Sequence, residues 1–219
     1  MVVRRKPQTS SGRSIKNGTA TPGDSDPVLH NLVASEIILL ATVLVCTIMI
    51  WNNNVNVYGI SYFGVTTPTL PIVAIGFVLS SSLLLIASAK LPTVAPFGLV
   101  KATIRVVSVG MVLLLLTPYT LDTFFNWSHM VLGATVFATE MYTGAVLCFR
   151  HMQDRVSKWA LATQLFGGLL AAFSLPDNML NFMLEGEVIF QIGFMILLNH
   201  FLHARPAIAA NPIAPDVQG

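Results

Sequence analysis

Six continuous apolar runs constrain the fold of this sequence more than any other feature. Each run is long enough to cross about 30 Å of hydrocarbon as an α-helix, and none alternates apolar and polar residues as a membrane β-barrel strand does. The runs cover about residues 34–51, 70–89, 102–119, 128–149, 158–175 and 186–203. The sequence therefore predicts an all-α, polytopic membrane protein built as a six-transmembrane-helix bundle.

The overall composition agrees with this fold class. Of 219 residues, 54% are hydrophobic and only 10% are charged, whereas a soluble domain carries about 25% charged residues. We expect membrane lipids as partners, with a second copy of the chain or another membrane protein as alternatives, and no nucleic acid. The spacing of His and Lys fits neither a di-haem nor a retinal protein, so we expect no cofactor.

All Lys and Arg residues fall on one side of a six-span arrangement. The opposite loops contain acids but no basic residue. The twelve basic residues are Arg4, Arg5, Lys6, Arg13, Lys16, Lys90, Lys101, Arg105, Arg150, Arg155, Lys158 and Arg205. Because cytoplasmic loops of membrane proteins are rich in Lys and Arg, we expect a multi-pass protein of the cell membrane with both termini in the cytoplasm.

Three segments follow from these patterns. Residues 1–31 are poor in apolar side chains and predict a disordered, basic cytoplasmic tail. Residues 32–203 form the transmembrane domain. Residues 204–219, "ARPAIAANPIAPDVQG", are rich in Pro and Ala and predict a disordered cytoplasmic C-terminal tail.

A first group of polar residues lies at the predicted outer face. The stretch "TLDTFFNWSH" joins the third and fourth spans and holds Asp122 and His129, and Ser128 is a candidate cap for the fourth span. The candidate ligand-binding residues of this face are Tyr62, Asp122, His129, Asp177, Glu187 and Gln191. They are interpreted either as solvated loop residues, with His129 bonded across the turn, or as a binding site for a small molecule or a lipid headgroup.

A third interpretation of the outer face is catalytic. Asp122, His129 and Glu187 could serve as acid and base, or hold a metal, in a lipid hydrolase. No HxxxH or HExxH pair accompanies His129. We therefore assign no metal site.

A second group of polar residues lies within the spans. Its members are Glu36, Arg105, Glu140, Gln164 and Asn199. A carboxylate in hydrocarbon is costly, so Glu140 should face the bundle and either pair with Arg105, with Gln164 as a fallback, or stay protonated. His129 and Glu140 are eleven residues apart and share one helix face. Glu140 is interpreted either as a link between helices or as part of a path for protons or substrate.

Three stretches carry a family resemblance. These are "YGISYFG" before the second span, "TPYTLDTFFNWSH" between the third and fourth, and "LEGE" at the start of the sixth. Over residues 34–203 the chain resembles an uncharacterised bacterial family of six-span integral membrane proteins allied to the Frag–DRAM–Sfk group. The resemblance implies Tyr62, Asp122, His129 and Glu187 as shared polar positions, and a lipid-associated role.

These observations favour a non-enzymatic membrane protein that associates with lipid or binds a partner protein. The alternative is an outer-face lipid hydrolase that depends on a metal or on acid–base chemistry. A second alternative is a proton-coupled transporter of small molecules that uses Glu140.

Overall fold

A computed structural model describes residues 27–175 and 180–204, which are helical or irregular with no strand. Six of the described helices are long and apolar enough to cross a membrane. They are α1 (Pro27–Met49), α4 (Leu70–Lys90), α5 (Phe97–Leu116), α6 (Thr123–Val146), α7 (Arg155–Ser174) and α8 (Met183–His203). The predicted fold class, an all-α bundle of six spans, is thereby confirmed.

Three shorter elements complete the described chain. Helix α6 continues without a break into a π-helical segment, η1 (Leu147–Met152), and the two form one span. Between α1 and α4 lie two short helices, α2 (Asn53–Tyr58) and α3 (Ile60–Phe63). The sequence pattern had indicated only a loop there, because both helices are too short to give a periodic signal.

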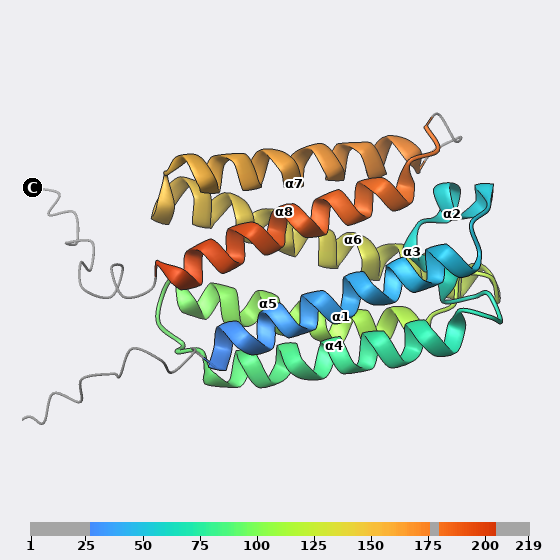
Figure 1. Cartoon of the computed structure of the whole chain (residues 1–219), viewed down its shortest axis with the longest axis horizontal. Helices are drawn as coiled ribbons and strands as arrows, with labels where there is room; N and C mark the ends of the chain where they lie inside the picture. Colours follow the sequence, from blue (N-terminus) through green and yellow to red (C-terminus); the bar gives the residue numbers. More distant parts are fainter. Residues whose placement is uncertain (1–26, 176–179, 205–219) are drawn as a thin grey trace, which may run out of the picture.

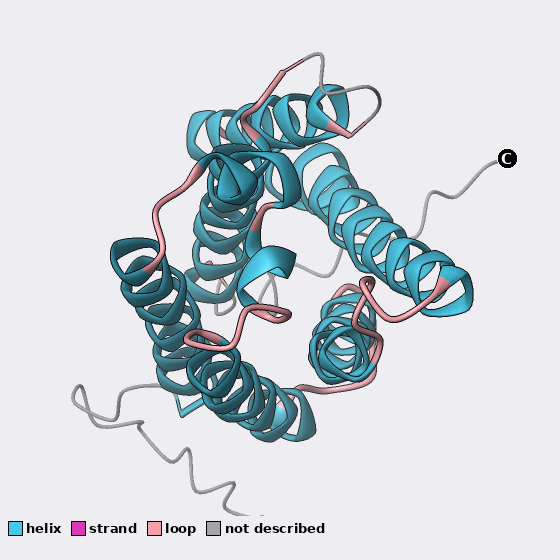
Figure 2. Ribbon diagram, turned by 90° about the vertical axis from the view of Figure 1, so that its right-hand side faces the viewer, coloured by secondary structure: helices cyan, strands magenta, loops and turns pink. Residues whose placement is uncertain are grey.

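The six long helices run side by side, and α1 begins at the same end at which α8 finishes (Figure 1). Seen along the bundle, α2 and α3 lie across the opposite end, between the surrounding helices (Figure 2). We call this the capped end. Helix α8 contacts α1, α6 and α7, and the chain otherwise packs in the order α1–α4–α5–α6.

The other end carries the basic residues of the described ranges, and we call it the basic end. Lys90 closes α4, Arg150 lies in η1, and Arg155 opens α7. Lys101 and Arg105 lie in the first half of α5, and Lys158 lies in the first turn of α7. The predicted gathering of Lys and Arg at one end therefore holds for every described basic residue.

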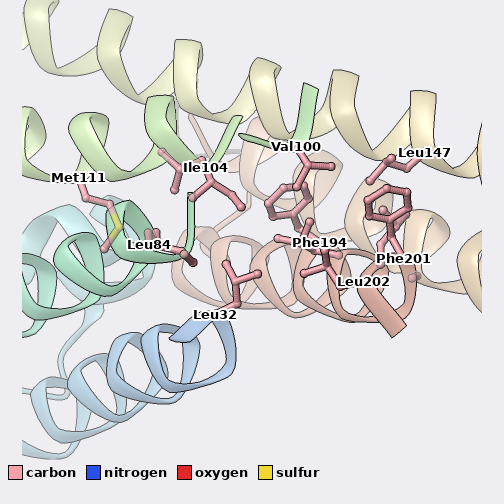
Figure 3. Packing of buried hydrophobic residues seen from close by; sticks show 14 of the residues in the cluster. Leu32, Leu84, Val100, Ile104, Met111, Leu147, Phe194, Phe201 and Leu202 are labelled. Carbon is pink, nitrogen blue, oxygen red and sulfur yellow. The ribbon is translucent and has the colours of Figure 1, made fainter. Parts of the chain in front are cut away.

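Apolar side chains fill the bundle toward the basic end. Leu32, Ile104 and Phe201 are completely or almost completely buried. The rings of Phe97 and Phe201 lie 5.3 Å apart and join α5 to α8. Figure 3 shows this packing, with Phe201 beside Leu147. This end is therefore closed by hydrocarbon side chains.

Large apolar side chains also cover the outside of the bundle. Ile48, Ile75 and Trp159 are 74%, 63% and 75% exposed. A soluble protein avoids so large an apolar surface, whereas in a bilayer the same surface meets lipid. The structure is therefore that of an integral membrane protein.

Two predicted boundaries are wrong. Helix α1 begins at Pro27, so residues 27–31 are helical and not part of a disordered tail; the rest of both predicted tails, apart from Ala204, lies outside the described residues. Helix α6 is capped by Asp122, whose carboxylate accepts the N–H of Phe125 at 2.9 Å, and not by Ser128. Both helices begin before the apolar run does, because polar residues in a first turn interrupt the run without interrupting the helix. At α6, Asp122 takes the capping position because Asp is a strong N-cap.

Candidate functional site

At the capped end, Glu187 ties α8 to the short helices. Its Oε2 accepts the backbone N–H of Ile60, the first residue of α3, at 2.7 Å. The preceding residue, Gly59, has φ 61°, which L-residues with side chains rarely adopt. A Cβ at Gly59 would also collide with the Glu187 carboxylate and with Met183. Glu187 therefore supplies the N-terminal acceptor that α3 lacks on its own.

His129 joins α6 to α3 and to the end of α5. Its Nδ1 lies 2.8 Å from the carbonyl oxygen of Thr117, and its Nε2 lies 2.8 Å from the hydroxyl of Ser61. Because a carbonyl only accepts, Nδ1 carries the proton, and in the neutral ring Nε2 accepts from Ser61. Both ring nitrogens are therefore engaged in the fold.

Three tyrosines stack beside His129. Tyr58 lies between Tyr62 and Tyr119, with ring centroids 6.3 Å and 5.6 Å away, and the Tyr119 ring meets His129 edge-on at 5.7 Å. Burial, with Tyr58 nearby, raises the pKa of Tyr119 to about 12. The stack connects α2 and α3 to the α5–α6 turn.

The hydroxyl of Tyr62 is held by two asparagines. The side-chain amides of Asn54 and Asn52 each donate to it at 3.4 Å. These donors lower the pKa of the Tyr62 phenol because they stabilise its charged form. We call the group formed by Tyr58, Tyr62, Tyr119, His129 and Glu187 the α2–α3 cap.

The three candidate catalytic residues have separate partners. Asp122 caps α6, Glu187 caps α3, and His129 bonds to Ser61 and Thr117. In the described ranges, no three His, Cys, Asp or Glu side chains come together in a way that could hold a metal ion. Asp177, the remaining predicted acid of this face, lies outside the described residues.

A second cluster surrounds Glu140, which is 1% exposed. Its Oε2 accepts from the side-chain amide of Gln191 at 3.1 Å, so Gln191 belongs to this cluster and not to the capped end. The predicted pairing of Glu140 with Arg105 is wrong. Arg105 is exposed, and its Nε donates to Ser88 Oγ at 3.4 Å.

The fallback pairing of Glu140 with Gln164 is also wrong. Gln164 is completely buried, but neither atom of its carboxamide has a hydrogen-bond partner. The carboxamide lies against Gly144, where an added Cβ would collide with it. Gly144 is one turn from Glu140 on the same face of α6, so Gln164 meets α6 one turn away from Glu140 and does not bond to it.

A further contact, which is partly buried, involves another acid. Glu36 of α1 accepts from the side-chain amide of Asn199 of α8 at 3.2 Å. Glu36 is close enough to Glu140 for the two charges to repel each other. We call the set of Glu36, Glu140, Gln164, Gln191 and Asn199 the buried polar layer.

Sequence reasoning missed three hydroxyl pairs between neighbouring helices. Each pair is buried, with oxygens 2.6–2.8 Å apart. They are Ser35–Ser80 between α1 and α4, Ser81–Ser108 between α4 and α5, and Thr103–Thr143 between α5 and α6. Together with the Glu140–Gln191 and Asn199–Glu36 bonds, they close a circuit α1–α4–α5–α6–α8–α1. The signal in the sequence was weak, since a Ser or Thr in a helix often bonds to its own backbone.

Comparison with family models, curated proteins and solved structures finds no match for the chain.

Proposed function

We propose that this integral membrane protein is non-enzymatic and that it binds lipid along the membrane-facing side of α6. The observation that carries the proposal is a shallow, open and largely apolar depression along one face of that helix, which we call the groove. Its lining comes from Val131, Ala134, Thr135, Ala138, Thr139 and Tyr142.

The packing of α6 explains why the groove stays open. Only three of its residues are buried, and all three lie in its second half, from Glu140 to Gly144. A second shallow surface continues toward the capped end past Phe124, Trp127 and Leu132. Trp belongs to the interfacial belt of membrane proteins, so a lipid whose chain lies along Ala134 and Ala138 would place its headgroup near Trp127.

The state of the polar groups at the capped end also supports a non-enzymatic role. Asp122, His129 and Glu187 each satisfy a backbone or hydroxyl group of the fold. A catalytic acid, base or ligand needs a position left open for substrate or water. The resemblance to the lipid-associated six-span group points in the same direction.

The same proposal includes an orientation. All described basic residues lie at the basic end, and such residues are concentrated on the cytoplasmic side of membrane proteins. The basic end and both termini therefore face the cytoplasm, and the α2–α3 cap faces the outside of the cell membrane.

Native mass spectrometry tests lipid binding. Protein released from membranes with a mild detergent should retain lipid, and Ala134→Phe with Ala138→Phe, which fills the groove, should remove it. Ala162→Phe on α7 is the matched control, because Ala162 is also exposed but lies outside the groove. This control should retain the same lipid as the wild type.

Three outcomes contradict the proposal. The wild type could emerge as a lipid-free monomer that turns over lipids from a panel, which would indicate the hydrolase. The groove-filling variant could retain the same lipids as the wild type. A second copy of the chain could occupy the groove in place of lipid, which would indicate partner binding.

A further inference from the structure

Polar side chains from three helices lie about halfway along the bundle, two of them in contact and the third one helical turn away. Glu140 of α6 bonds to Gln191 of α8. The carboxamide of Gln164, on α7, lies against Gly144, which is one turn along α6 from Glu140. Gln164 is near the middle of α7 and Gln191 near the middle of α8. The cluster is thus remote from both membrane surfaces.

Several atoms of this cluster have no partner. They are Oε1 of Glu140 and both polar atoms of the Gln164 carboxamide. Glu140 is 1% exposed and Gln164 is not exposed at all, so surrounding solvent does not satisfy them. Native proteins hold few such atoms, and those that persist often mark a functional site.

The charges around the cluster are unbalanced. Glu36 on α1 adds a second carboxyl, and its charge would repel that of Glu140. Most charged groups on the neighbouring helices are engaged elsewhere or exposed, and the half-buried Glu185, whose Oε2 has no partner, lies in the first turn of α8 and not beside Glu140. On α5, Lys101 donates to the Leu91 carbonyl and Arg105 to Ser88; on α7, Arg155 and Lys158 are exposed; on α8, Glu187 accepts from Ile60 and His200 bonds to Asp154.

We propose that Glu140 and Gln164 form a binding site for a monovalent cation, a proton or a sodium ion, in the middle of the membrane. Either occupant neutralises the Glu140 carboxylate, which hydrocarbon surroundings otherwise disfavour. A sodium ion would take oxygen ligands from the carboxylate and from the Gln164 carboxamide, since hard cations prefer oxygen. This site is independent of the lipid groove, which lies on the opposite, membrane-facing side of α6.

Labelling with dicyclohexylcarbodiimide tests the site in the purified full-length protein. This apolar reagent modifies protonated carboxyls in apolar surroundings, and peptide mass spectrometry locates the modified residue. We expect Glu140 to be modified at pH 6 and about tenfold less at pH 9, because the reactive form is the protonated one. The exposed carboxyls of the same protein serve as the internal reference.

Added salt distinguishes the two cations. If NaCl but not KCl suppresses labelling at constant pH, the site takes sodium; if neither salt acts, the site takes a proton. Both results support the proposal. Labelling that is absent from Glu140 at every pH, or that is unaffected by both pH and sodium, would overturn it and leave Glu140 as a link between α6 and α8.

A variant separates binding from a merely structural role. Gln164→Leu keeps the volume but removes both amide atoms, and it should shift the pH profile of Glu140 labelling or abolish the effect of sodium. Gln153→Leu, at an exposed glutamine beyond η1, should do neither. An unchanged profile in Gln164→Leu would remove Gln164 from the site.

Discussion

The α2–α3 cap and the buried polar layer contain similar side chains but differ in how many of their polar atoms have a hydrogen-bond partner. In the cap, His129 uses both ring nitrogens and Glu187 accepts a backbone N–H. In the buried layer, Gln164 uses neither amide atom and Glu140 leaves one oxygen free. Polar groups that satisfy one another stabilise a fold, whereas buried groups left without partners cost free energy and need another explanation. The comparison therefore assigns structure to the cap and binding to the buried layer.

The largest effect should come from Gly59, on which the cap depends. Gly59→Val places a β-branched side chain at φ 61° and against the Glu187 carboxylate. We expect a loss of about 3 kcal/mol of stability, from backbone strain together with the collision. Thermal unfolding in detergent would measure it. Gly133→Ala is the control, because a Cβ there meets nothing within 4 Å; an equal loss in both variants would contradict a structural role for Gly59.

The next effect should come from Glu187. Glu187→Ala removes the acceptor of the Ile60 N–H, and a hydrogen bond to a charged group contributes about 2 kcal/mol. Hydrogen exchange at the Ile60 amide should therefore become about thirty-fold faster. Glu185→Ala, two residues away, should leave that amide unchanged. If Glu187→Ala left the exchange rate of Ile60 as it is, the cap would not depend on this carboxylate.

A smaller effect should follow from removing one link of the buried circuit. Thr103→Val keeps the shape of the side chain but removes its bond to Thr143. Side-chain hydrogen bonds between membrane helices contribute about 0.6 kcal/mol on average, so unfolding in detergent should shift only slightly. Thr135→Val, whose hydroxyl bonds within its own helix, should shift less. A loss of stability in Thr103→Val above about 2 kcal/mol, the contribution expected of the Glu187 hydrogen bond, would reverse the ranking of the two regions.

The smallest effect should be a change in ionisation at the cap. The Asn54 amide holds the pKa of the Tyr62 phenol below its usual range, so Asn54→Ala should raise that pKa toward the ordinary value. Tyr119, with a pKa of about 12, should ionise last. Ultraviolet absorbance of tyrosinate, followed with pH in Tyr62→Phe and Tyr119→Phe, would separate an early and a late component. A single shared transition would contradict the different surroundings of the two phenols.

The sequence predicted the spans well because hydropathy and length suffice to define them. It could not predict which face of each span points inward, since these helices are apolar on nearly every side and give no clear amphipathic phase. For this reason Arg105 was assigned to Glu140, although it lies on the exposed side of α5, and Gln191 was assigned to the outer face.

The roles of individual polar residues were harder to predict than their presence. Glu187, His129 and Tyr62 were identified as special positions, but their partners Ile60, Ser61 and Asn54 lie in short helices that hydropathy does not detect. The hydroxyl pairs were missed because a serine that links two helices looks in the sequence like one that bonds to its own backbone.

The placement of both regions depends on one claim, that the cap and the basic end lie on opposite sides of the membrane with the cap outside. Cysteines at Asn53 and Thr93, both exposed, test it directly in a background with Cys46→Ala and Cys148→Ala. A membrane-impermeant thiol reagent should label the Asn53 position in intact cells, and the Thr93 position only after permeabilisation. Labelling of the Thr93 position in intact cells, with the Asn53 position protected, would contradict the orientation, and labelling of both would contradict the six-span topology.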